Sequence, residues 1–124
     1  FVERILAGDG ALTEAEMKTY MKPFQNPGED RRPTLTWPRQ IPIAGEPEEV
    51  VKIASCYESF LAESNIPKLF INAEPGSILV GKQREKARLW LNQKEVTVRG
   101  GHFIQEISPH EIGGHLKEFL ASLD

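Results

Sequence analysis

Residues 68–73 read KLFINA and decide the fold class of this chain. The run is short and mostly apolar, which is typical of a strand buried on both faces of a parallel β-sheet. Residues 95–98 (EVTV) are β-branched and alternate in polarity, so they predict a second strand. Between the two, residues 82–91 predict a helix whose inward positions are Ala87, Trp90 and Leu91.

Further helices flank this unit. A helix is predicted over residues 47–63, because Pro47 suits a first helical turn and apolar residues follow on one face: Val50, Ile53, Tyr57, Phe60 and Leu61. Residues 108–111 (SPHE) form a capping box that begins a final helix, with an apolar face of Ile112, Leu116, Phe119 and Leu120. The order indicates an α/β fold with one right-handed βαβ unit. Since two parallel strands need further strands at an edge, we expect the rest of the sheet upstream of Phe1.

The N-terminal third is predicted to be helical and then irregular. Residues 13–16 (TEAE) form a capping box, which predicts a short helix that ends before Pro23. Residues 1–6 are charged and have the apolar spacing of a helix rather than a strand. Six prolines between residues 23 and 47 predict a long ordered loop or a hinge, because each fixes φ and removes a donor.

The composition excludes several classes of protein. The net charge is −3 and the basic residues are dispersed, so a nucleic-acid partner is not expected. Cys56, which we place among core positions of its helix, is the only cysteine in this sequence, so it cannot form an internal disulfide and has no companions at metal-ligand spacing. No apolar run is long enough to span a membrane, and we expect a cytoplasmic location. The start at Phe1 has neither an initiator Met nor a signal-peptide pattern, so we interpret the chain as a fragment.

His102 is the candidate catalytic residue. It follows two glycines after the second predicted strand, and catalytic groups in open α/β sheets gather at that edge. An ordinary loop histidine is the alternative. His110 and His115 resemble a zincin HExxH motif with one residue too many, which places them on different helix faces, so we interpret them as solvated.

Three blocks of sequence resemble the haloalkane dehalogenase family, and they occur in the family's order. They are RRPTLTWPRQIPIAG at residues 31–45, PKLFINAEPG at residues 67–76 and GHFIQE at residues 101–106. The resemblance implies an α/β-hydrolase fold, of which this chain supplies the C-terminal part of the parallel sheet with flanking helices. Residues 1–42 would be the end of the helical cap domain, and residues 43–124 the end of the core domain.

The resemblance also implies a reaction. In the family, an aspartate displaces halide from carbon and forms an alkyl-enzyme ester, which water hydrolyses after activation by the residue that His102 matches. No cofactor and no metal take part. The expected partners are a small halogenated hydrocarbon, water, halide ion and the N-terminal half of the same enzyme, with no membrane.

Pocket residues are carried over from the family in the same way. Trp37, Pro38 and Ile41 match cap positions that line the halide and substrate cavity, Ser77 and Ile78 match the tunnel mouth, and Phe103 follows the base. Loop or core packing is the alternative for each. The aspartate nucleophile, the halide-binding tryptophan and asparagine and the glutamate that orients the histidine lie upstream in the family. Asp9 sits among glycines but follows no buried strand, so we interpret it as a turn residue. We interpret Glu74 as structural or solvated, and a substitute catalytic acid is the alternative.

Two departures and two alternative functions remain open. Residues 7–12 are shorter than the family's cap stretch, which bears on the tunnel and substrate choice. Ile107 stands where an acidic residue is common, and we expect this departure to be neutral. Coelenterazine-oxidising luciferases related to these dehalogenases share RRPTL at residues 31–35 and the pair at residues 102–103. An inactive complementation fragment is the other alternative.

Overall fold

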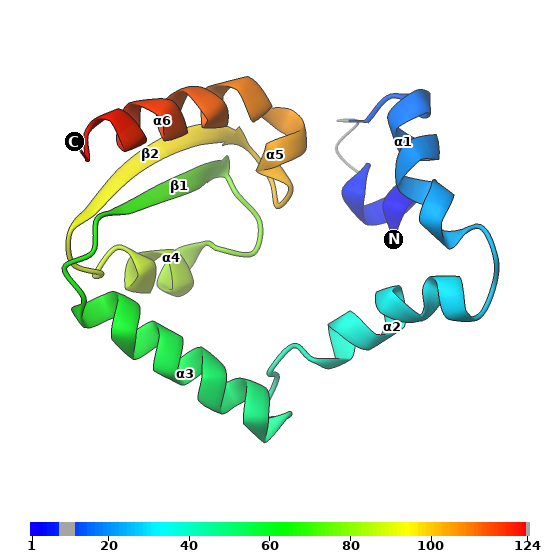
Figure 1. The fold of residues 1–124 in the computed structure, drawn as a ribbon, viewed down its shortest axis with the longest axis horizontal. Coiled ribbons are helices and arrows are strands. Elements are labelled where there is room, and N and C mark those ends of the chain that lie inside the picture. The colour runs from blue at the N-terminus through cyan, green and yellow to red at the C-terminus, as the bar shows by residue number, and fades with distance from the viewer. Residues whose placement is uncertain (8–11, 124) are drawn as a thin grey trace. The chain divides into compact units, whose positions relative to one another are not determined.

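The computed structural model describes residues 1–7 and 12–123 and divides into two compact units, Phe1–Glu58 and Ser59–Asp124. In the described part of the chain, the first unit is helical and the second contains the β-sheet (Figure 1). No described helix is long and apolar enough to cross a membrane.

The first unit opens with a helical turn and a capped helix. Residues Val2–Leu6 form a single π-helical turn, which confirms that this segment is helical. Helix α1 (Glu14–Met21) carries the predicted capping box: the Thr13 N–H donates to Glu16 Oε2 at 2.7 Å, and the Glu16 N–H donates to Thr13 Oγ1 at 3.3 Å. These two bonds satisfy donors that a helix start otherwise leaves open.

The prediction of irregular structure over residues 23–47 is wrong for its middle part. Helix α2 (Arg32–Arg39) lies inside it, preceded by 3-10 turns at Lys22–Phe24 and Glu29–Arg31. Pro33 falls in the first turn, where no N–H donor is required. Pro38 lies inside the helix, where it cannot donate to the carbonyl four residues earlier, and α2 ends one residue after it. The number of prolines in a segment is therefore a poor guide to whether the segment is irregular, because the free-energy cost of each proline depends on its position within a helix.

Helix α3 (Glu48–Glu63) confirms the helix predicted over residues 47–63. Its apolar face is nevertheless open, with Ile53 at 50%, Tyr57 at 64% and Phe60 at 55% exposed. Cys56 is also exposed, so its predicted place among core positions is wrong. The helical period is present, but of the predicted face only Val50 and Leu61 are half-buried.

Strands β1 (Lys68–Pro75) and β2 (Gln93–Gly100) form a parallel pair, as predicted, and each is longer than the apolar run that indicated it. The register places Lys68 opposite Gln93 and Pro75 opposite Gly100, so both strands end together. The centre of the pair is its best-covered part. Val98 is 1% exposed, and buried Asn72 donates from Nδ2 to Thr97 Oγ1 at 3.2 Å.

Helix α4 (Gly81–Ala87) is shorter than the predicted range of residues 82–91. Asn92 has a positive φ of 49°, and the Lys68 ammonium donates to the Leu91 carbonyl at 2.9 Å, so the chain has already turned toward β2. Of the predicted inward residues, Ala87 and Trp90 are half-buried, but Leu91 is 54% exposed. The inward assignment of Leu91 is therefore wrong.

Helices α5 (Ile104–Ile107) and α6 (Pro109–Ala121) complete the second unit. Helix α6 is the predicted final helix, and in Figure 1 it runs along the strand pair on the side opposite α4. The capping box predicted at its start is absent, because the Ser108 hydroxyl donates instead to the Arg99 carbonyl at 2.9 Å. Ser108 thus ties the helix start to β2.

Candidate functional site

A small pocket lies at the carboxyl ends of the two strands. Its volume is about 130 Å³, and it is lined by Ile71, Ala73, Ser77, Ile78, Leu79, Gly101, His102 and Ile104. The structure therefore brings together three of the predicted site residues: His102, Ser77 and Ile78. Ligand pockets commonly enclose roughly 300–1,000 Å³, so this pocket by itself is smaller than a typical substrate site.

Glycine at the end of β2 lets the chain turn toward His102. Gly100 has a φ of +151°, and a side chain there would begin 3.0 Å from Ile104 Cγ2 and 3.3 Å from Ile107 Cδ1. The strand end therefore packs directly against α5. Ile107, the departure from the family pattern, contributes an apolar contact at this point.

His102 is exposed and its imidazole packs on one neighbour. The ring centroids of His102 and Phe103 lie 4.5 Å apart, and the planes meet at 64° in an edge-to-face arrangement. This contact restrains one side of the imidazole. Phe103 thus supports His102, but it is not among the residues that line the pocket.

The turn after β1 carries the other half of the pocket. Gly76 begins it with a φ of +76°, and its N–H donates to the Gly100 carbonyl at 2.9 Å. Ser77 and Ile78 follow, both exposed, with Ile78 at 64%. One hydrogen bond therefore joins the turn that bears Ser77 to the strand end that precedes His102.

The three predicted cap residues belong to the first unit. Trp37 and Pro38 lie in the last turn of α2, and Ile41 follows the helix. Their side chains are exposed, with Trp37 at 65% and Ile41 at 43%. An exposed tryptophan and isoleucine on one short segment form an apolar surface available for a ligand or for packing.

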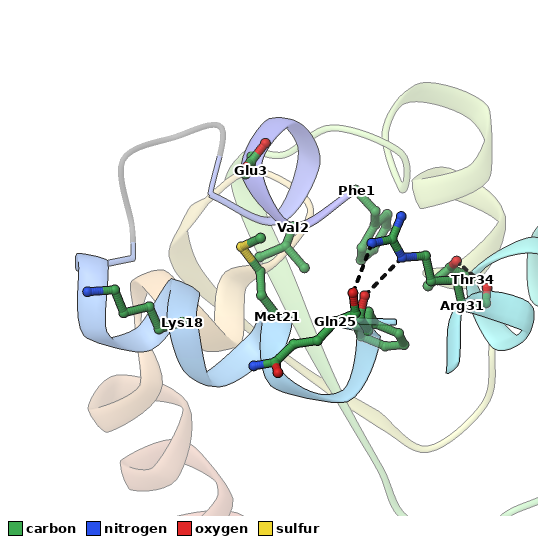
Figure 2. Close-up of a pocket in the computed structure, with 9 residues that line it drawn as sticks. Phe1, Val2, Glu3, Lys18, Met21, Gln25, Arg31 and Thr34 are labelled. Atoms are coloured by element: carbon green, nitrogen blue, oxygen red, sulfur yellow. Dashed lines mark hydrogen bonds between the residues drawn. The ribbon is translucent and has the colours of Figure 1, made fainter. Parts of the chain in front are cut away.

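A larger cavity of about 750 Å³ lies in the first unit and contains none of the predicted site residues (Figure 2). Phe1, Val2 and Met21 make it partly apolar. Arg31 spans one side, where Nε donates to the Phe24 carbonyl at 2.9 Å and Nη2 to the Gln25 carbonyl at 3.2 Å (Figure 2). Its ionisable lining residues are Glu3, Lys18 and Arg31, and it has no histidine, whereas the pocket at the strand ends contains His102.

Other polar candidates have structural surroundings. Glu74 lies 3.4 Å from Arg84 Nη1, and Asp30 accepts from Asn26 Nδ2 at 2.9 Å. His110 is exposed on α6, and among the described residues no group of three His, Cys, Asp or Glu side chains is placed to hold a metal. Asp9 lies outside the described residues, so the structure does not test its interpretation as a turn residue.

Sequence reasoning missed five of the pocket residues: Ile71, Ala73, Leu79, Gly101 and Ile104. The strand ends offered a signal, because groups at the carboxyl edge of a parallel sheet converge there. Leu79 and Ile104 offered none, since their positions depend on how the turn and α5 fold back.

No protein-family model matches this chain. Solved structures do: the crystal structure of wild-type DbjA superimposes with a TM-score of 0.90 and 36% identity, covering 98% of this chain and 42% of that one. A haloalkane dehalogenase of Sphingobium indicum is 57% identical over 125 residues, which is 99% of this chain and 42% of the relative. The coelenterazine h 2-monooxygenase of Renilla reniformis is 40% identical over 124 residues, 97% of this chain and 40% of the relative.

These likenesses define the class first: the chain has the α/β-hydrolase fold. Within that class, it is a homologue of the C-terminal portion of haloalkane dehalogenases, which confirms the resemblance found in the sequence. The chain spans about two fifths of the length of the curated relatives that it matches.

Proposed function

We propose that this chain is the C-terminal part of a haloalkane dehalogenase, which hydrolyses a carbon–halogen bond to an alcohol and halide. One observation carries the proposal: His102 lines a pocket with Ser77 and Ile78 at the carboxyl edge of the strands. Identity of 57% to a haloalkane dehalogenase and of 40% to a coelenterazine monooxygenase favours dehalogenation over luciferase chemistry.

In the proposed reaction, an aspartate outside this chain attacks the halogen-bearing carbon, and halide leaves with the bonding electrons. An alkyl-enzyme ester results. His102 then accepts a proton from water as that water attacks the ester carbonyl, which releases the alcohol and regenerates the carboxylate. His102 suits this role because an imidazole nitrogen can accept a proton from water, and its ring packs against Phe103.

We assign the substrate and halide cavity to Trp37, Pro38, Ile41, Ser77, Ile78 and Phe103. The first three would belong to the cap domain, residues 1–42, and the others to the core domain, residues 43–124. Exposure of Trp37 and Ile78 supports a role at a surface that contacts substrate. We further propose a cytoplasmic enzyme that requires no cofactor or metal and functions with its N-terminal half.

The test uses the complete polypeptide and 1-haloalkanes. His102→Gln should release about one equivalent of halide per enzyme and retain the alkyl group on the protein, seen as added mass, because only ester hydrolysis is blocked. Steady turnover should fall by about 100- to 10,000-fold.

His110→Gln is the matched control, since His110 is exposed on α6 and is not among the residues that line the pocket. It should turn over as the wild type does. Light emission from coelenterazine without halide release by the wild-type enzyme would replace the proposal with the luciferase alternative.

A further inference from the structure

Arg84 is the most extensively bonded side chain near the His102 pocket. It stands on α4 with its side chain only 14% exposed. Its guanidinium donates to three backbone carbonyls, Ala73 at 3.0 Å, Pro75 at 3.3 Å and Leu79 at 3.2 Å, and lies 3.4 Å from the Glu74 carboxylate. These acceptors lie on both sides of the turn at residues 76–78. The planar fork of arginine can bridge such acceptors, which a single ammonium group cannot do.

Gly76 leaves the space that Arg84 occupies. A Cβ at residue 76 would lie 2.6 Å from Arg84 Nη2 and 2.9 Å from the Ala73 carbonyl oxygen. The same glycine donates its N–H to Gly100 O at 2.9 Å, one residue before the pocket-lining Gly101. The turn is thus held from one side by the guanidinium and from the other by the end of β2.

We propose that Arg84 is a positioning residue that sets the substrate preference of this site. It holds the turn so that Ser77, Ile78 and Leu79 form one wall of the pocket opposite His102. The inference rests on the proposed function, because it assigns a consequence for substrate choice to that same pocket. Arg84 itself is absent from the pocket lining, so it acts through the turn.

Arg88 is the matched comparison for Arg84, because it is a second arginine at α4 whose partner lies away from the turn. It extends from the end of α4 and pairs with Glu95 through bonds of 2.8 Å and 2.6 Å. Glu95 lies near the start of β2, five residues before Gly100, so the pair is remote from the pocket end of the strand. Arg88 therefore matches Arg84 in chemistry and differs in what it restrains.

The experiment compares Arg84→Ala, Arg84→Lys and Arg88→Ala in the complete enzyme. Halide release from 1-chlorobutane and 1-chlorohexane gives kcat and KM for a shorter and a longer substrate. We expect the ratio of the two kcat/KM values to change about tenfold in both Arg84 variants, because a small displacement of the wall alters the fit. The Arg84→Lys variant should not recover the wild-type ratio, since a single ammonium group cannot bond to acceptors on both sides of the turn. In Arg88→Ala the ratio should stay within about twofold of the wild type.

Amide hydrogen exchange supplies a readout that does not need activity. Exchange of the Gly76 and Val80 amides, which donate to the Gly100 and Ile78 carbonyls, should accelerate in the Arg84 variants and remain unchanged in Arg88→Ala. Folded Arg84 variants with the wild-type substrate ratio and unchanged exchange would overturn the inference, as would failure of both Arg84 variants to fold, since Arg84 would then be a general stabiliser. A wild-type enzyme that releases no halide from any haloalkane would instead reject the proposed function, and the exchange comparison would still test the restraint on the turn.

Discussion

At the scale of single residues, backbone conformation and close contacts account for the shape of the pocket. Gly76 and Gly100 both have positive φ, and in both a side chain would meet atoms at 3.0 Å or less. The two glycines bond to one another through the Gly76 N–H and the Gly100 carbonyl. Glycine is therefore required here for two separate reasons, conformation and space.

Gly76→Ala should destabilise the complete enzyme by about 1–3 kcal/mol, because the residue stays in a left-handed conformation while its methyl group displaces the Arg84 guanidinium. Urea denaturation measures the change. Gly113→Ala is the control: it lies in α6 with no atom within 4 Å of the new Cβ, and it should be neutral or stabilising by about 0.5–1 kcal/mol. Equal losses in both variants would contradict the role given to Gly76.

The Arg88–Glu95 pair predicts a pH dependence at the residue scale. Hydrogen bonds from Arg88 lower the pKa of Glu95 below its ordinary range. A group whose folded pKa is depressed contributes stability above its unfolded pKa and loses it as pH falls through the folded pKa. The gap in unfolding free energy between wild type and Glu95→Gln should be steady near neutral pH and close in acid. Urea melts across pH measure it, and a gap that persists in strong acid contradicts the assignment.

At the scale of elements, long-range hydrogen bonds decide where segments begin and end. Lys68 donates to the carbonyls of Ser64, Ile66 and Leu91, which ties the start of β1 to the segment that leads into β2. Ser108 ties the start of α6 to β2 through the Arg99 carbonyl. Both sets of hydrogen bonds include partners from elements that sequence patterns predict one at a time, so the patterns do not predict these bonds.

Ser108→Ala should cost about 0.5–1.5 kcal/mol, because it removes the hydrogen bond to Arg99. Glu111→Ala should change stability by no more than about 0.5 kcal/mol, since Glu111 is exposed and the capping box that would use it is absent. Chemical denaturation of the complete enzyme separates the two cases. Comparable losses of stability from both substitutions would indicate that Ser108 and Glu111 do form a capping box, contrary to the structure.

At the scale of the whole molecule, the described chain has very little core. Among its described hydrophobic residues, only Leu6 and Val98 are buried, at 7% and 1% exposed. Buried apolar area is the main favourable term in folding, and it must offset a large loss of conformational entropy. Ile53, Tyr57 and Phe60 on α3 and Ile78 in the turn after β1 are also exposed.

We expect the isolated 124-residue chain to unfold without a cooperative transition and to release no halide. The second component is a separately produced N-terminal portion of the complete polypeptide. Adding it should restore a cooperative melt and halide release together. Circular dichroism and a halide assay measure both. Halide release by the isolated chain contradicts the proposal that its nucleophile lies elsewhere.

Local sequence patterns predicted the regular elements well. The helix over residues 47–63, both strands, the capping box at Thr13 and the final helix are confirmed, because each follows from a period or a cap within a few residues. The family resemblance is confirmed for the same chain. The placement of His102 after β2 also follows from the order of elements.

Only the tertiary structure decided how these elements build a site. In the structure, α4 ends at Ala87, and the Ser108 hydroxyl bonds to the Arg99 carbonyl of β2 instead of capping α6. Gly76 leaves the space that the Arg84 guanidinium occupies beside the turn. The tertiary structure also placed Ser77 and Ile78 in one pocket with His102. The physical reason is that these features depend on contacts between residues far apart in the chain, whereas caps and periods depend on neighbours along it.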